Sequence, residues 1–103
     1  MQLQTVKRAG TKPTFAKPTS SDTAPVGSAL IVKNDSAGSI DVTLITEGVL
    51  PTGDDYPDKV YTVAAAGEVW IPVLREYQPA AGGDAAVTFS ATTSVTAACV
   101  STK

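Results

Sequence analysis

The sequence contains no histidine and only one cysteine, Cys99, among its 103 residues. Without histidine there is no imidazole for general acid–base catalysis or for activating a serine or cysteine nucleophile. A single thiol cannot form a disulfide within the chain, and it cannot build a Cys/His zinc site. These absences exclude the commonest catalytic and metal-binding classes. A chain of this length provides one domain with one modest core.

The remaining chemical groups give no catalytic site, so we expect a protein that is not an enzyme and needs no cofactor. Asp54 and Asp55 lie in a polar loop without the apolar surroundings that adapt carboxylates to acid–base work. Together with Asp58 they offer oxygens to calcium, but their spacing differs from that of an EF-hand loop, and we predict no metal. Cys99 alternates with small apolar residues and has no basic neighbours in sequence, which predicts a buried, inert thiol.

Leucine is scarce, with five residues, whereas the chain has 14 Thr, 12 Val and 15 Ala. This composition favours strands over helices. Alternation of apolar and polar residues predicts a hairpin of strands 29–34 and 40–46, and Pro72 predicts that its strand is an edge or carries a bulge. The six strands expected in all are 29–34, 40–46, 59–63, 69–74, 86–91 and 95–100. We therefore predict an all-β fold, a small antiparallel sandwich or barrel of about six to eight strands.

Charge divides the chain into two parts, because residues 1–18 hold four of the eight cations and none of the ten acids. The net charge of −2 therefore splits into a basic segment and an acidic remainder. Three prolines favour extended backbone in residues 1–27, so we predict an extended basic arm there, either a disordered tail or a segment that becomes ordered on a partner, and a β-domain at 28–103. Such an arm can meet nucleic acid, a membrane surface or an acidic protein subunit. We expect no nucleic acid, because four cations and one interleaved aromatic are few for that role.

The candidate partner-binding residues come from the basic arm and from the acidic loop at 48–58. Phe15 is the apolar anchor of the arm, and the acidic loop is suited to receive a basic arm from another copy. Trp70 is expected in the core, with an interface anchor or a sugar-stacking platform as alternatives. The candidates are Lys7, Arg8, Lys12, Phe15, Lys17, Asp54, Asp55, Tyr56 and Asp58.

No apolar run reaches the length of a secretory signal or of a membrane-spanning helix. We therefore expect synthesis and assembly in the cytoplasm and no membrane contact. A single unpaired cysteine agrees with a reducing compartment.

Three segments carry a resemblance to a known class: ALIVKNDSAGSIDVTLITEG, VYTVAAAGEVWIPV and AAVTFSATTSVTAACVS. Their Val/Thr strands, the Ala-Gly turn before an aromatic-bearing strand and the final Ser-Val-Thr strand resemble small β-rich proteins encoded beside the capsid genes of tailed bacteriophages. Those proteins are capsid decoration (cement) proteins or other minor head components. The resemblance covers residues 28–103, and the arm has no matching motif.

The resemblance implies a virion structural protein that binds the outer surface of a phage capsid. Its partner would be the major capsid protein, and a symmetric homo-oligomer, with a trimer favoured, would lie on the shell while its arm crosses neighbouring subunits. One alternative is a tail-tube, neck or head–tail joining protein, whose rings would stack through the arm and the long loop. Another is a carbohydrate- or protein-binding β-sandwich module.

Overall fold

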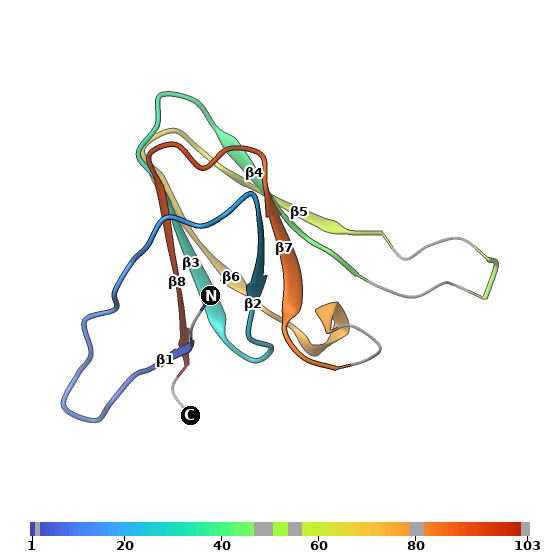
Figure 1. Ribbon diagram of the computed structural model, residues 1–103, viewed down its shortest axis with the longest axis horizontal. Coiled ribbons are helices and arrows are strands. Elements are labelled where there is room, and N and C mark those ends of the chain that lie inside the picture. The colour runs from blue at the N-terminus through green and yellow to red at the C-terminus, as the bar shows by residue number, and fades with distance from the viewer. Residues whose placement is uncertain (2, 47–50, 54–56, 79–81, 102–103) are drawn as a thin grey trace.

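The computed structural model describes residues 1, 3–46, 51–53, 57–78 and 82–101, which form a β-sandwich (Figure 1). Sheet A has the strand order β1-β8-β3-β6, and sheet B has the order β2-β7-β4-β5. The all-β prediction is confirmed. The elements are β1 (Leu3–Thr5), β2 (Ser21–Ala24), β3 (Ala29–Asn34), β4 (Ile40–Leu44), β5 (Lys59–Val63), β6 (Gly67–Pro72), the 3-10 turn η1 (Arg75–Tyr77), β7 (Ala85–Phe89) and β8 (Val95–Ser101).

The core lies between the two sheets and is built from the inward residues of alternating strands. Leu30 and Val32 of β3 face Val42 and Leu44 of β4 across a cluster of buried aliphatic side chains. Apolar alternation with period two places one face of each strand in this cluster. The six strands expected from the sequence all form, with small shifts at their ends.

The predicted hairpin of strands 29–34 and 40–46 is wrong, because β3 and β4 belong to different sheets. β3 pairs with β6 and β8, whereas β4 pairs with β5 and β7. Asn34, fully buried where β3 ends, donates from its side-chain amide to the carbonyls of Gly38 (2.9 Å) and Val63 (3.1 Å), and its oxygen accepts the Ser36 backbone N–H (3.0 Å). These bonds hold the connection as an arch between the sheets and satisfy the buried amide.

The edge position predicted from Pro72 is confirmed, since β6 is the last strand of sheet A. Proline has no N–H to donate, and an edge strand needs a partner on one side only.

Residues 3–5, 16 and 21–24 of the N-terminal segment pair with the sandwich, and the structure does not show the expected extended arm. β1 pairs in parallel with the end of β8, Ala16 forms an isolated antiparallel bridge with Ala97, and β2 pairs with β7. The segment thus gives each sheet one edge strand, because its prolines fall between the paired residues. That this segment crosses to a neighbouring subunit stays a prediction.

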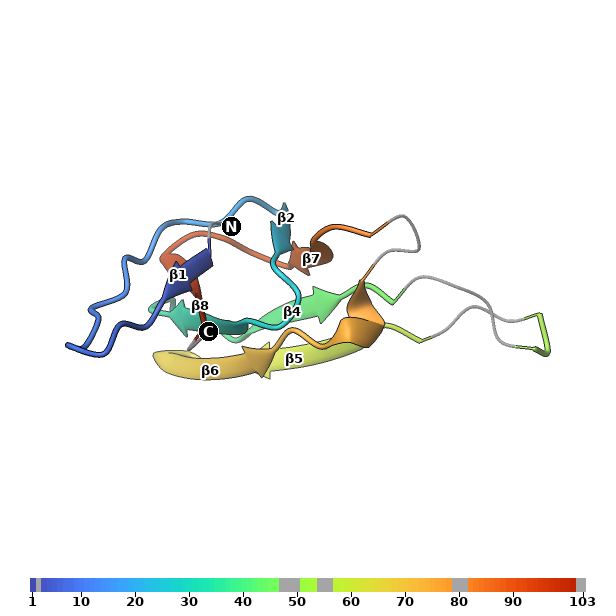
Figure 2. The same cartoon turned by 90° about the horizontal axis from the view of Figure 1, so that it is seen from below.

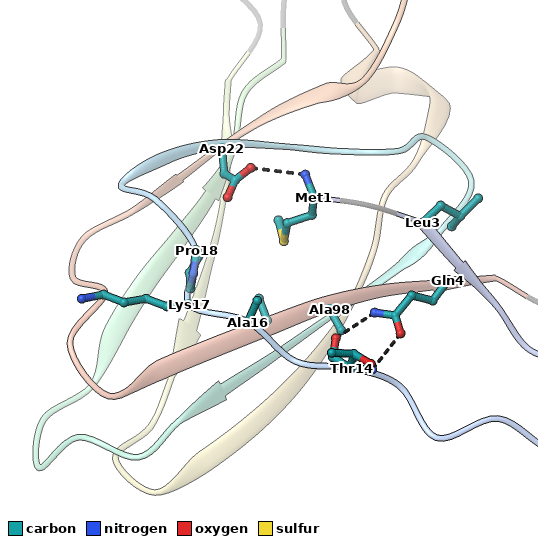
Figure 3. Close-up of a pocket in the computed structure, with 10 residues that line it drawn as sticks. Met1, Leu3, Gln4, Thr14, Ala16, Lys17, Pro18, Asp22 and Ala98 are labelled. Carbon is teal, nitrogen blue, oxygen red and sulfur yellow. Dashed lines mark hydrogen bonds and ion pairs between the residues drawn. The ribbon is translucent and has the colours of Figure 1, made fainter.

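An ion pair closes the side of the sandwich where β1 and β2 run (Figures 2 and 3). The Met1 ammonium lies 3.3 Å from Oδ1 of Asp22. Partial burial alone would raise the pKa of Asp22, but backbone N–H bonds from Thr23 and Thr19 and the Met1 ammonium outweigh it and lower the pKa below its ordinary value. The carboxylate therefore stays ionised and ties the two edge strands together.

Candidate interaction surface

Two of the three residue rows on the outer face of sheet A are apolar, although this face points away from the core; the third row, Lys33 with Glu68 and Thr96, is polar. Ile31 of β3 lies opposite Trp70 of β6 on one side and Ala98 of β8 on the other. In the adjacent row, Ala29 lies opposite Pro72 and Val100. A sheet with one solvated face normally carries polar residues there. We therefore expect other residues to shield these apolar side chains from water.

A loop formed by residues 6–15, which we call the basic loop, projects from the edge of sheet A formed by β1 and β8 (Figure 1), and its residues Val6, Thr11 and Pro13 line a groove together with residues of this face. It leaves β1, turns at Lys7–Gly10 through a bond from Gly10 N–H to the Lys7 carbonyl (2.9 Å), and returns to the β8 edge. The side-chain amide of Gln4 clamps its two ends, donating to the Thr14 carbonyl (2.8 Å) and accepting the Thr14 N–H (2.7 Å). The loop therefore has a defined conformation that its own hydrogen bonds maintain.

A groove of about 540 Å³ lies between the basic loop and the sheet. Most of its lining is apolar, and we call it the Trp70 groove. Ile31 and Val100 of the sheet are almost wholly buried there, whereas Trp70 is 60% exposed. Its principal lining residues are Val6, Thr11 and Pro13 of the loop and Ile31, Trp70 and Val100 of the sheet.

The prediction that Trp70 is a core residue is wrong. Ile71, its neighbour in β6, faces the core, so alternation turns Trp70 outward. Its indole Nε1 donates to Oε2 of Glu68 (2.9 Å), and Oε1 of that carboxylate lies 3.9 Å from the Lys33 ammonium. The signal for this position was in the sequence, because a strand face shared by Glu68, Trp70 and Pro72 is typical of solvent exposure.

The structure brings four of the predicted partner-binding residues together on the basic loop. Lys7, Arg8 and Lys12 are exposed on it. Phe15 is half-buried at its end, with the Lys33 ammonium 4.0 Å from the ring centroid, so this ring packs on its own chain. Lys17, also exposed, follows the loop along the β8 edge.

The loop cations take part in none of the ion pairs seen within the described ranges. Those pairs are Met1 with Asp22 and Lys33 with Glu68. These cations on a defined loop place positive charge beside an apolar groove.

The predicted acidic site is separate from this surface. Asp54, Asp55 and Tyr56 lie outside the described residues. Asp58 is exposed, and its Oδ1 accepts the backbone N–H of Thr46 (2.9 Å). Residues 51–53 of the same loop extend from the end of the molecule opposite the basic loop (Figure 1).

A second cavity of about 530 Å³ lies beside β1, between it and the returning chain (Figure 3). The Met1–Asp22 pair and the Gln4–Thr14 clamp are among its lining residues. It is the seam along which the N-terminal segment attaches to the sandwich.

The titratable groups of the interior are held in their neutral forms. Burial is the main cause that raises the pKa of the Cys99 thiol. Burial, helped by a 3.4 Å contact with the Tyr61 hydroxyl, raises the pKa of Tyr77 to about 12. Among the residues that the structure describes, no three His, Cys, Asp or Glu side chains gather as a metal site would need. The surface of sheet A combines apolar area with the positive charge of the basic loop.

The described part of the chain contains no helix with the length and hydropathy needed to cross a bilayer. The chain matches no protein-family model, and comparison with curated proteins and with solved structures gives no significant match either. The function is therefore inferred from the side chains on this surface.

Proposed function

We propose that this chain is a non-enzymatic structural protein of a virion, one that binds the outer surface of a phage capsid and stabilises the shell. The observation that carries this is the exposed indole of Trp70, set in an apolar groove beside the unpaired cations of the basic loop. Tryptophan and arginine are the residue types that most often dominate the energy of protein interfaces.

Stabilisation of the shell by such a surface requires no covalent reaction. A protein that binds the assembled shell but not its free subunits stabilises the shell by mass action. In this proposal the major capsid protein is the partner, and copies of the chain assemble as a homo-oligomer, with a trimer favoured. The N-terminal segment supports contact with neighbours, since β1 has only three residues and pairs at the sheet edge, where strands can exchange partners.

Co-sedimentation with undecorated shells, assembled from the major capsid protein of the same source, tests the proposal. The intact chain is expected to sediment with the shells and to raise the temperature at which they open. Trp70→Ser is expected to weaken binding by ~tenfold or more, as at other interface hot spots. Val60→Ser is the matched control, because Val60 is 48% exposed on the outer face of sheet B. Failure of the intact chain to bind the shells would sink the proposal.

The exposed indole also favours a second candidate, a carbohydrate- or protein-binding β-sandwich module. An exposed aromatic ring is a stacking platform for a sugar as well as an anchor for a protein. A glycan array separates the two: a glycan bound through Trp70, together with no binding to shells, would favour the module. Electron microscopy of particles distinguishes many copies over the shell from rings at one vertex, the arrangement expected of a tail or neck protein.

A further inference from the structure

We propose that the Trp70 groove accepts an acidic, extended segment of the partner protein, with an aliphatic or aromatic side chain seated against the indole. This inference rests on the proposed function, which supplies a protein partner. It adds the chemistry of the segment that the partner must present.

The dimensions and lining of the groove fit an apolar side chain. Its volume of about 540 Å³ falls within the range of sites that enclose small ligands. Ile31 and Val100, which are 1% and 8% exposed, form its floor, and Trp70 and Pro13 contribute to its sides. An aliphatic or aromatic side chain placed there removes the exposed indole from water without leaving a polar group unpaired.

The charge around the groove selects an acidic segment. Lys7 and Arg8 follow the lining residue Val6 in the chain, and Lys12 lies between the lining residues Thr11 and Pro13. No acidic residue occurs among the described residues that line the groove. The nearby carboxylate of Glu68 already has the Trp70 indole and the Lys33 ammonium as partners.

Other occupants fit these features less well. A second copy that met this groove with its own groove would present the same positive charge and no acidic lining residue, and like charges across an interface oppose association. A single-stranded nucleic acid binds through several stacked aromatics along a basic track, and this groove offers one exposed indole.

The test uses the intact chain and two short synthetic peptides. Both have a central Leu-Pro-Phe; the first is flanked by aspartate and glutamate, and in the second every acid is lysine. Trp70 is the only tryptophan in the sequence, so its fluorescence and its single indole N–H resonance report the groove directly. We expect the acidic peptide to shift the emission to shorter wavelength and to perturb resonances of Trp70, Ile31 and Val100. The lysine peptide is expected to bind at least ~tenfold more weakly.

A pair of charge reversals provides the matched control. Arg8→Glu is expected to weaken binding of the acidic peptide ~threefold to tenfold, because one cation at the rim becomes an anion. Arg75→Glu makes the same change in η1, on the side of the molecule away from the basic loop, and is expected to leave binding unchanged (Figure 1). Equal binding of both peptides, or equal effects of the two reversals, would overturn the inference. Perturbation of the same resonances by oligothymidine at equal affinity, or by self-association of the free chain, would overturn it too.

The outcomes separate this inference from the proposed function. Shell binding that survives both Trp70→Ser and Arg8→Glu would keep the function and overturn the groove as its docking site. Binding of the acidic peptide in the groove without any binding to shells would keep the groove and overturn the function.

Discussion

The two outer faces of the sandwich differ more than the two sheets that carry them. Each sheet has four strands, and each buries one side of its strands in the same core. On the outside of sheet B, Thr43 of β4 lies opposite Thr88 and Val60, and Asp41 accepts a hydrogen bond from the Thr62 hydroxyl (3.0 Å). On the outside of sheet A, the corresponding positions are Ile31, Trp70 and their apolar neighbours.

This difference separates a face suited to water from one that is apolar in two of its rows and partly covered by its own chain. Threonine suits a solvated sheet, because it combines a β-branched side chain with a hydroxyl. An apolar outer face gains stability only when something covers it, and the basic loop covers one part of sheet A. The Trp70 groove is the part left accessible.

The largest expected difference in stability is between two opposite substitutions at the central outward positions, Ile31 of sheet A and Thr43 of sheet B. Ile31→Thr replaces the ethyl branch of a buried side chain by a hydroxyl that has no partner there, so we expect a loss of about 2–3 kcal/mol in the free energy of unfolding. Thr43→Ile, at the equivalent central position of sheet B, is expected to change it by less than about 0.5 kcal/mol. Urea denaturation measures both, and equal losses would show that the two faces are equally covered.

Deleting residues 1–16 removes the cover of sheet A while leaving β2 in sheet B. The edge of β8 and the apolar outer face then meet water, so we expect a loss of about 2 kcal/mol and a tendency to associate. Denaturation together with light scattering at several concentrations checks this. A truncated chain that is as stable and as monodisperse as the intact one would contradict it.

Asp22→Asn breaks the link between the two edge strands and has a smaller effect. The folded pKa of Asp22 is lowered, so its stabilisation is present above the unfolded pKa and disappears as the pH falls through the folded value. We expect the substitution to cost about 1 kcal/mol at neutral pH and nothing in acid below both pKa values. Denaturation at pH 7 and at acid pH tests this, and a pH-independent loss would point to packing instead.

Ionisation of Tyr77 changes the free energy of unfolding only in alkaline solution, so at neutral pH it has the smallest effect of the four. Its pKa is raised from 10.0 to about 12, so the neutral phenol is favoured by folding and the associated stability is lost as the pH rises through this interval. Absorbance titration of the phenolates should show a late-ionising tyrosine that is missing in Tyr77→Phe. A Tyr77 that ionises near its ordinary pKa of 10.0 would contradict the buried position.

The sequence predicted local structure better than the connections between elements. Alternation around β5 and β8 located these strands, because burial of one face imposes a period of two. Alternation cannot distinguish a hairpin from an arch, and the arch after β3 depends on Asn34 reaching carbonyls near residue 64 that are distant in sequence. β1 and β2 were missed because their residues are polar and prolines surround them.

The candidate surface was predicted in part. The charge imbalance identified the basic loop residues, but nothing in the sequence shows that Gln4 binds Thr14 and so closes the loop beside sheet A. The expectation that Trp70 lies in the core is wrong, because the alternation of β6 turns its side chain outward. The groove is formed by residues that are distant in sequence. They come together only because β1 pairs with β8, which the sequence does not predict.

Burial of Cys99 determines how fast its thiol can be modified. In the parallel pairing of β1 with β8, Leu3 lies opposite Cys99, so the first strand of the chain flanks the only sulfhydryl. A water-borne alkylating reagent meets this sulfur only when the sandwich opens, and each modified molecule records one such event. The rate at which Cys99 is alkylated therefore measures how often this edge of the sandwich opens, and a partner bound to the N-terminal segment would lower that rate.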